Sequence, residues 1–86
     1  MKAGRIAVDW PDEARADLRR IDRVAAMQIL HCLTRYLKTG VGDVKQLQPP
    51  RTELRLRCGD YRLFFVLCGQ NAIAITAVES RGNAYR

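Results

Sequence analysis

Apolar and polar side chains alternate strictly in one part of the chain, and this pattern predicts strands. From Thr52 to Arg57, Leu54 and Leu56 fall on one side and charged residues on the other, which is typical of a half-buried strand. Two further apolar segments, Tyr61–Cys68 and Ala72–Glu79, are expected to form the next strands. The side chains predicted to point into the core from these two strands are Leu63, Phe65, Leu67, Ile73 and Ile75.

The N-terminal half has helical spacing instead. After a short predicted strand at Arg5–Val8, the side chains of Trp10, Ala14, Leu18 and Ile21 follow one another at intervals of four, four and three, as on one face of a helix. Asp9 is expected to cap this helix, with Pro11 in its first turn. A second helix is predicted from Arg23 to Lys38, capped by Asp22 and ended by Gly40.

The connections define the fold class. Almost no loop separates the two helices, so we expect them to form an antiparallel hairpin. The segment Val41–Arg51 is predicted to be a loop, since it has two early glycines and ends near Pro49-Pro50. The sequence therefore predicts an α+β fold in the order β-α-α-β-β-β, a small and mainly antiparallel sheet covered on one face by the helix hairpin. Residues 1–86 are expected to form a single domain, because 86 residues are too few to close a second core.

Composition excludes several classes of protein. No apolar run reaches the ~20 residues of a membrane span, and the start of the chain does not resemble a signal peptide, so we expect a cytoplasmic protein without membrane contact. The three cysteines, Cys32, Cys58 and Cys68, are odd in number and have no CxxC spacing. They predict neither a disulfide nor a metal site. No Cys or Asp is placed to make His31 a metal ligand or part of a proton relay, so His31 is interpreted as structural.

The charge distribution suggests an anionic partner. Fifteen Lys and Arg residues against nine Asp and Glu residues give a net charge of +6. Most of the excess lies after residue 34, where nine bases accompany four acids. Arginine grips phosphate with two parallel hydrogen bonds, so nucleic acid is the leading candidate partner; a solvated basic surface is the alternative.

The predicted pairing concentrates arginines on the open face of the sheet. A two-residue turn at Gly59-Asp60 places Arg57 opposite Arg62 and Arg55 opposite Phe64. Like charges directly opposite each other destabilise a strand pair. Either nearby acids, Glu53 and Asp60, or a bound phosphate backbone would offset this repulsion, and the ring of Phe64 offers a surface on which a base could stack.

The hairpin resembles a known family. The segment Leu54–Phe65, a leucine-rich strand followed by a glycine turn and Tyr61-Arg62, is similar to the central hairpin of the RelE/ParE toxin superfamily. The resemblance extends to the first helix at Trp10–Leu18, to the segment Gly42–Leu47 before the hairpin, and to the terminal Arg-rich segment Ser80–Arg86.

This resemblance implies a toxin of a bacterial type II toxin–antitoxin pair. Two activities compete within the superfamily: RelE-like members cleave mRNA in the ribosomal A site, and ParE-like members inhibit DNA gyrase. A degenerate toxin that only binds its antitoxin is the third possibility. Arg81 and Tyr85 favour mRNA cleavage, because gyrase inhibition has no chemical need for a phosphate clamp. The implied partners are a cognate antitoxin protein, laid across the helix hairpin or the basic face, and mRNA on the ribosome; no cofactor is implied.

The resemblance also implies roles for individual residues. Arg62 and Arg81 match the arginines that stabilise the scissile phosphate, and Tyr85 matches the terminal tyrosine that orients the substrate. Arg55 and Glu53 occupy positions where the best-known members carry basic catalytic residues, usually Lys. Arginine remains protonated and is a poor proton acceptor, which leaves Glu53 as the candidate base. Further candidates for RNA binding are Arg57, Phe64, Lys45 and Arg51.

Overall fold

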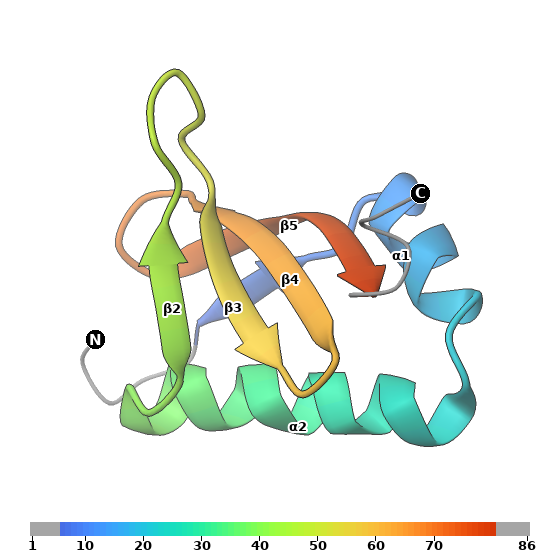
Figure 1. Ribbon diagram of the computed structural model, residues 1–86. Coiled ribbons are helices and arrows are strands. Elements are labelled where there is room, and N and C mark those ends of the chain that lie inside the picture. Colours follow the sequence, from blue (N-terminus) through green and yellow to red (C-terminus); the bar gives the residue numbers. More distant parts are fainter. Residues whose placement is uncertain (1–5, 81–86) are drawn as a thin grey trace.

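The computed structural model describes residues 6–80 and has two layers, a twisted sheet and a pair of helices (Figure 1). The elements in chain order are β1 (Ala7–Asp9), α1 (Asp12–Arg19), α2 (Arg23–Thr39), β2 (Asp43–Gln46), β3 (Leu54–Cys58), β4 (Tyr61–Leu67) and β5 (Ala72–Ser80). The strand order in the sheet is β1-β5-β4-β3-β2. Only β1 runs parallel to its neighbour, and the other pairs are antiparallel. The predicted α+β fold class is confirmed.

The core lies between one face of the sheet and both helices. α1 packs against β5 and α2 packs against β3. The central row of the sheet, Leu56–Leu63–Val78, is buried, as is Phe65 one row further along. Helix residues Ala14, Ile29 and Leu33 close over this face. The helices therefore cover one side of the sheet and leave the other side open for a functional surface.

Local signals set the ends of the second helix as the sequence predicts. The carboxylate of Asp22 accepts hydrogen bonds from the backbone amides of Val24 and Ala25, at 3.1 and 3.4 Å. At the other end Gly40 adopts φ = 76°, and its amide donates to the carbonyl of Tyr36 at 2.8 Å. A left-handed φ of this kind favours glycine, which explains why the helix stops here.

The predicted cap of the first helix is wrong. Pro11 occupies the N-cap position of α1, and no side chain caps the helix there. Asp9 instead belongs to β1, where it pairs with Ala74 of β5. The strand continues to the residue that the sequence pattern assigned to the helix, because pairing with β5 satisfies the backbone in this segment.

The segment after α2 is also more ordered than predicted. Four residues of the expected loop Val41–Arg51 form β2, an edge strand antiparallel to β3. Val44 lies opposite the fully buried Leu56, whereas the other positions of β2 are exposed. One half-buried side chain in four residues gives too weak an alternation to identify a strand, and only the pairing with β3 defines it as one.

The sheet departs from the predicted pattern at Leu67 as well. This side chain was expected in the core but is 59% exposed. Leu67 pairs with Ile73 on one side, but β3 begins only opposite Phe65, so no strand covers the other side of Leu67. Phe64 and Phe65 are both buried although they point to opposite faces of β4, because Phe65 faces the core and Phe64, on the open face, is covered by the guanidinium of Arg51.

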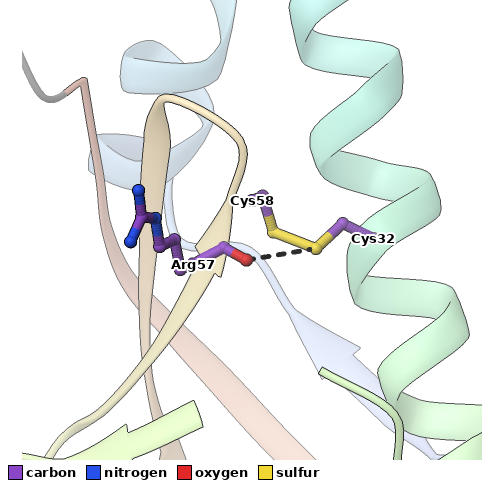
Figure 2. Close-up of a disulfide and its surroundings, with 3 residues drawn as sticks. All are labelled: Cys32, Arg57 and Cys58. Atoms are coloured by element: carbon purple, nitrogen blue, oxygen red, sulfur yellow. Dashed lines mark hydrogen bonds between the residues drawn. A yellow bond between two sulfur atoms is a disulfide. The ribbon is translucent and has the colours of Figure 1, made fainter. Parts of the chain in front are cut away.

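The prediction of no disulfide is contradicted. Cys32 of α2 and Cys58 at the end of β3 form a disulfide, with Cα atoms 5.9 Å apart, whereas Cys68 is free and exposed (Figure 2). Cysteine spacing along the chain does not reveal this pair, because the two residues meet only when α2 crosses the sheet. Within residues 6–80, no helix is long and apolar enough to cross a membrane, and no cluster of metal-binding side chains is found.

Candidate functional site

The open face of the sheet carries a row of four charged residues, one from each of four adjacent strands. Asp43 of β2 lies opposite Arg57 of β3, which lies opposite Arg62 of β4, which in turn lies opposite Glu79 of β5. The predicted pairing of Arg57 with Arg62 is thus confirmed. The two arginines occupy the middle of the row and the two acids its ends, so the like-charge pair is flanked but not separated by carboxylates.

A second row on the same face runs parallel to the first. Lys45 lies opposite Arg55, which lies opposite Phe64. This pairing brings Lys45 beside the arginine cluster, although the sequence placed it in a loop. The β2 strand, which the sequence pattern missed, is therefore what adds the fourth cation to the surface.

The two rows enclose a hollow of about 170 Å³ beside the β3–β4 turn. We call it the cationic hollow, and its lining residues are Asp43, Lys45, Arg55, Arg57, Gly59, Asp60, Tyr61 and Arg62. Within residues 6–80, the side chains of its four cations make no ion pair and no hydrogen bond. The cations outnumber the acids in the lining by two, and they are held by hydrogen-bonded strands, an arrangement suited to a phosphate group.

Arg51 and Glu53 form a separate pair beside the hollow. Arg51 donates two hydrogen bonds to the carboxylate of Glu53, from Nη2 to Oε2 at 2.9 Å and from Nε to Oε1 at 3.3 Å. The same guanidinium lies over the ring of Phe64, with its central carbon 5.6 Å from the ring centroid. Phe64 is only 6% exposed, so stacking of a base on this ring requires Arg51 to move away.

This pairing changes the acid–base character of Glu53. The hydrogen bonds from Arg51 hold the pKa of Glu53 below its usual value, and the same contact raises the pKa of Arg51. A carboxylate with a lowered pKa is a weaker proton acceptor. In this arrangement the carboxylate of Glu53 is occupied by its ion pair with Arg51, and it can act as a base only after Arg51 has moved away.

The effect of Arg51 on Glu53 can be measured directly. We expect Arg51→Ala to raise the pKa of Glu53 towards its ordinary value, because the charge-assisted hydrogen bonds that favour the ionised form are lost. A titration of the Glu53 side-chain carboxyl carbon by NMR checks this shift. Arg20→Ala, which removes the partner of Asp17 on α1, is the matched control and should leave Glu53 unchanged. An unchanged pKa of Glu53 in Arg51→Ala would contradict the assigned pair.

The structure brings together most of the residues that the sequence singled out. Arg55, Arg57, Arg62 and Lys45 line one hollow, and Phe64 lies in the adjoining row next to the Arg51–Glu53 pair. Their catalytic and RNA-binding roles stay predictions. The other two candidates, Arg81 and Tyr85, lie outside the described residues.

Sequence reasoning missed two contributors to the hollow. Asp43 was assigned to a loop, and the signal that could have placed it in a strand is Val44 between two charged residues. Tyr61 was used only as part of a motif. Tyr61 contributes to the lining beside the turn, while it also packs against the hydrophobic core next to Cys58.

The fold and the hollow together define a small α+β protein with a preformed cationic surface on an open sheet. Residues 8–85 match the family model described as "ParE toxin of type II toxin-antitoxin system, parDE". The chain belongs to this family, and it is a toxin of a type II toxin–antitoxin system. This confirms the resemblance to the RelE/ParE superfamily. No curated protein matches the sequence.

Solved structures confirm the fold. The chain is 23% identical to one in the toxin–antitoxin complex RelBE2 from Mycobacterium tuberculosis, covering 91% of this chain and 100% of that chain with a TM-score of 0.74. The archaeal RelE–RelB complex from Pyrococcus horikoshii gives 20% identity, coverage of 92% and 98%, and a TM-score of 0.73. The YoeB dimer from Staphylococcus aureus gives 19% identity, coverage of 88% and 97%, and a TM-score of 0.70. At these identities the likeness establishes the fold alone.

Proposed function

We propose that this toxin is a ribosome-dependent endoribonuclease that cleaves mRNA, through attack of a ribose 2′-OH on the adjacent phosphate. The observation that carries the proposal is the cationic hollow, in which Lys45, Arg55, Arg57 and Arg62 surround one space without ion-pair partners among residues 6–80. Four cations held close together without bound anions repel one another. A bound ribose-phosphate chain would relieve this repulsion, and attraction between its phosphates and the four fixed cations would hold the chain in one position.

The main role of the arginines would be to stabilise negative charge in the transition state. As the 2′-oxygen attacks, negative charge builds up on the phosphate oxygens, and preorganised guanidinium groups stabilise that charge without having to rearrange. Arg57 and Arg62, which lie opposite each other on neighbouring strands, would grip the phosphate from two sides. Their side chains stay protonated throughout, so their role does not depend on pH in the physiological range.

Proton transfer is the weaker part of the site. Arg55 cannot accept the 2′-OH proton, and Glu53 is bound by Arg51 in the protein alone. We propose that an RNA phosphate draws Arg51 away and frees Glu53 to act as the base. Arg81 and Tyr85, outside the described residues, would complete the clamp and orient the substrate. Because a general base typically contributes about 10²–10⁴ in rate, cleavage without the ribosome should be slow.

The proposed protein partner is an acidic antitoxin. The structures from M. tuberculosis and Methanococcus jannaschii are toxin–antitoxin complexes, and those from P. horikoshii and M. jannaschii are complexes of RelE with RelB. For this chain, an acidic segment laid over the cationic hollow would neutralise its charge and block access of RNA. An antitoxin and a ribosome as partners imply a cytoplasmic location, which we propose for this chain.

Inhibition of DNA gyrase is the second candidate. It is favoured by the match to a family model named for ParE. A protein that acts by binding gyrase would not require a free phosphate clamp, whereas the proposed nuclease does.

One experiment separates the two functions. Purified toxin is added to a reconstituted translation system, and mRNA ends are mapped by primer extension; in parallel, supercoiling by purified gyrase is measured with the same toxin preparation. The proposal expects mRNA cuts at the ribosomal A site and normal supercoiling. Intact mRNA with blocked supercoiling would replace it with the gyrase assignment. Intact mRNA with normal supercoiling, and normal growth on overexpression, would indicate a toxin that only binds its antitoxin.

A further inference from the structure

A covalent bond joins the helix layer to the strand that carries Arg57. Cys32 on α2 is linked to Cys58, the last residue of β3 and the immediate neighbour of Arg57 (Figure 2). The sulfur of Cys32 also lies 3.7 Å from the backbone carbonyl oxygen of Arg57, whose guanidinium lines the cationic hollow on the opposite side of the sheet. The bond is therefore one residue away from a proposed phosphate ligand.

The same geometry accommodates the reduced state. A reduced Cys32 thiol has the Arg57 carbonyl within reach as a hydrogen-bond acceptor. Cys58, which is 8% exposed, lies among apolar core residues, where a thiol packs as a small hydrophobe. Neither oxidation state leaves an unsatisfied polar group, so both are compatible with the same fold. Disulfides inside mesophilic cells, where present, are usually transient and often redox-sensing.

We propose that Cys32 and Cys58 form a reversible redox pair that controls how firmly the Arg57 end of β3 is held against α2. The segment closed by the bond spans 26 residues and contains β2 and β3. Three of the four cations in the hollow, Lys45, Arg55 and Arg57, belong to this segment. Oxidation restricts the segment on which most of the hollow is built, and reduction releases it.

The chemistry is thiol–disulfide exchange with a cellular dithiol. A dithiol thiolate attacks the sulfur of Cys32, the less buried of the two residues, breaks the S–S bond and forms a mixed disulfide. Cys58 leaves as a thiolate and takes up a proton. The second thiol of the dithiol then displaces Cys32, giving two protein thiols and an oxidised dithiol. A small-molecule disulfide drives the reverse reaction, with two protons and two electrons passing from the cysteines to that oxidant.

Thiol counting and thermal melting test the pair. Purified toxin treated with oxidised glutathione and then freed of it is expected to show one thiol reactive with Ellman's reagent in denaturant, which is Cys68, and all three after reduction with dithiothreitol. Glutathione could also form an adduct with Cys68, so the count is repeated in Cys68→Ser. In this variant we expect no reactive thiol after oxidation and two reactive thiols after reduction. Reduction should lower Tm by roughly 10 °C, since the released bond closed a long loop.

Two variants make the melting experiment specific. Cys68→Ser should retain the full difference in Tm between oxidised and reduced protein, because Cys68 lies outside the pair. Cys32→Ser should melt at the same temperature with and without dithiothreitol. The proposal is overturned if Cys68→Ser shows two reactive thiols after oxidation, or if reduction leaves its Tm unchanged.

Binding of RNA shows whether the pair acts on the hollow, and this part rests on the proposed function. A single-stranded RNA oligonucleotide titrated against Cys68→Ser should bind about tenfold more weakly to the reduced form, as for loss of one well-placed arginine contact. Equal affinity of the two forms would overturn the control of the hollow. Absence of RNA binding in both forms would overturn the proposed function instead, while the thiol count and the Tm shift still decide whether the redox pair exists.

Discussion

Replacing Arg62 by alanine is expected to lower the rate of mRNA cleavage about 10²–10³-fold in the reconstituted translation system, because it removes one of the two paired guanidinium groups that we propose to bind the scissile phosphate. The rate is measured by primer extension at saturating toxin. Folding should not suffer. Arg57 loses a like-charged neighbour on one side and Glu79 loses an oppositely charged neighbour on the other, so the two small effects oppose each other and stability should change by no more than about a few tenths of a kcal/mol.

The combination of lost activity and unchanged stability is what distinguishes a functional arginine from a structural one. Arg35→Ala is the matched control, since it removes an exposed arginine on α2, outside the hollow. It should cleave at nearly the wild-type rate, which shows that net charge alone does not explain the effect. Cleavage by Arg62→Ala at the wild-type rate would remove this residue from the proposed clamp.

Replacing Phe65 by alanine is expected to lower the free energy of unfolding by about 3–5 kcal/mol. Phe65 is fully buried between the sheet and the helices, and its ring packs against Tyr36 of α2 with centroids 6.1 Å apart. Truncation loses the transfer free energy of the ring and leaves a cavity. Since small domains have about 5–15 kcal/mol in total, the variant should be close to unfolding.

Urea denaturation followed by circular dichroism measures this loss. Leu67→Ala on the same strand is the matched control, because its side chain is 59% exposed and has little packing to lose. It should change stability by no more than about 0.5 kcal/mol. An equal loss in both variants would mean that the sheet is not covered by α2 as described.

Neighbouring residues of the β3–β4 hairpin thus have different roles, some in stability and some in the proposed function. Leu63 and Phe65 bury one face of β4, while Arg62 faces the hollow on the other. The repulsion between Arg57 and Arg62 is a small cost in stability that the buried core offsets many times over. A stable core therefore allows the open face to hold an excess of cations over acids in one hollow.

Local sequence was sufficient wherever a signal and its partner lie close together. The register of the β3–β4 hairpin followed from the two-residue turn, and Asp22 and Gly40 fixed the ends of α2. The local pattern failed at Asp9. This residue was predicted to cap the first helix, but it belongs to β1 because it pairs with β5, which lies far along the chain. The difference is one of distance along the sequence, since local patterns carry no information about a remote strand.

The amino-acid sequence by itself determined the α+β fold class, the arginine-bearing hairpin and the family resemblance, because alternation, turns and caps act within a few residues. Only the tertiary structure decided that Asp43–Gln46 is a strand that brings Lys45 to the arginines, that Arg51 holds Glu53, and that Cys32 meets Cys58. Strand pairing brings Lys45 to the arginines and helix–sheet packing brings Cys32 to Cys58 from separate parts of the chain, whereas the backbone before β3 aligns Arg51 with Glu53 two residues away. The resulting contacts depend on geometry that residue spacing does not encode.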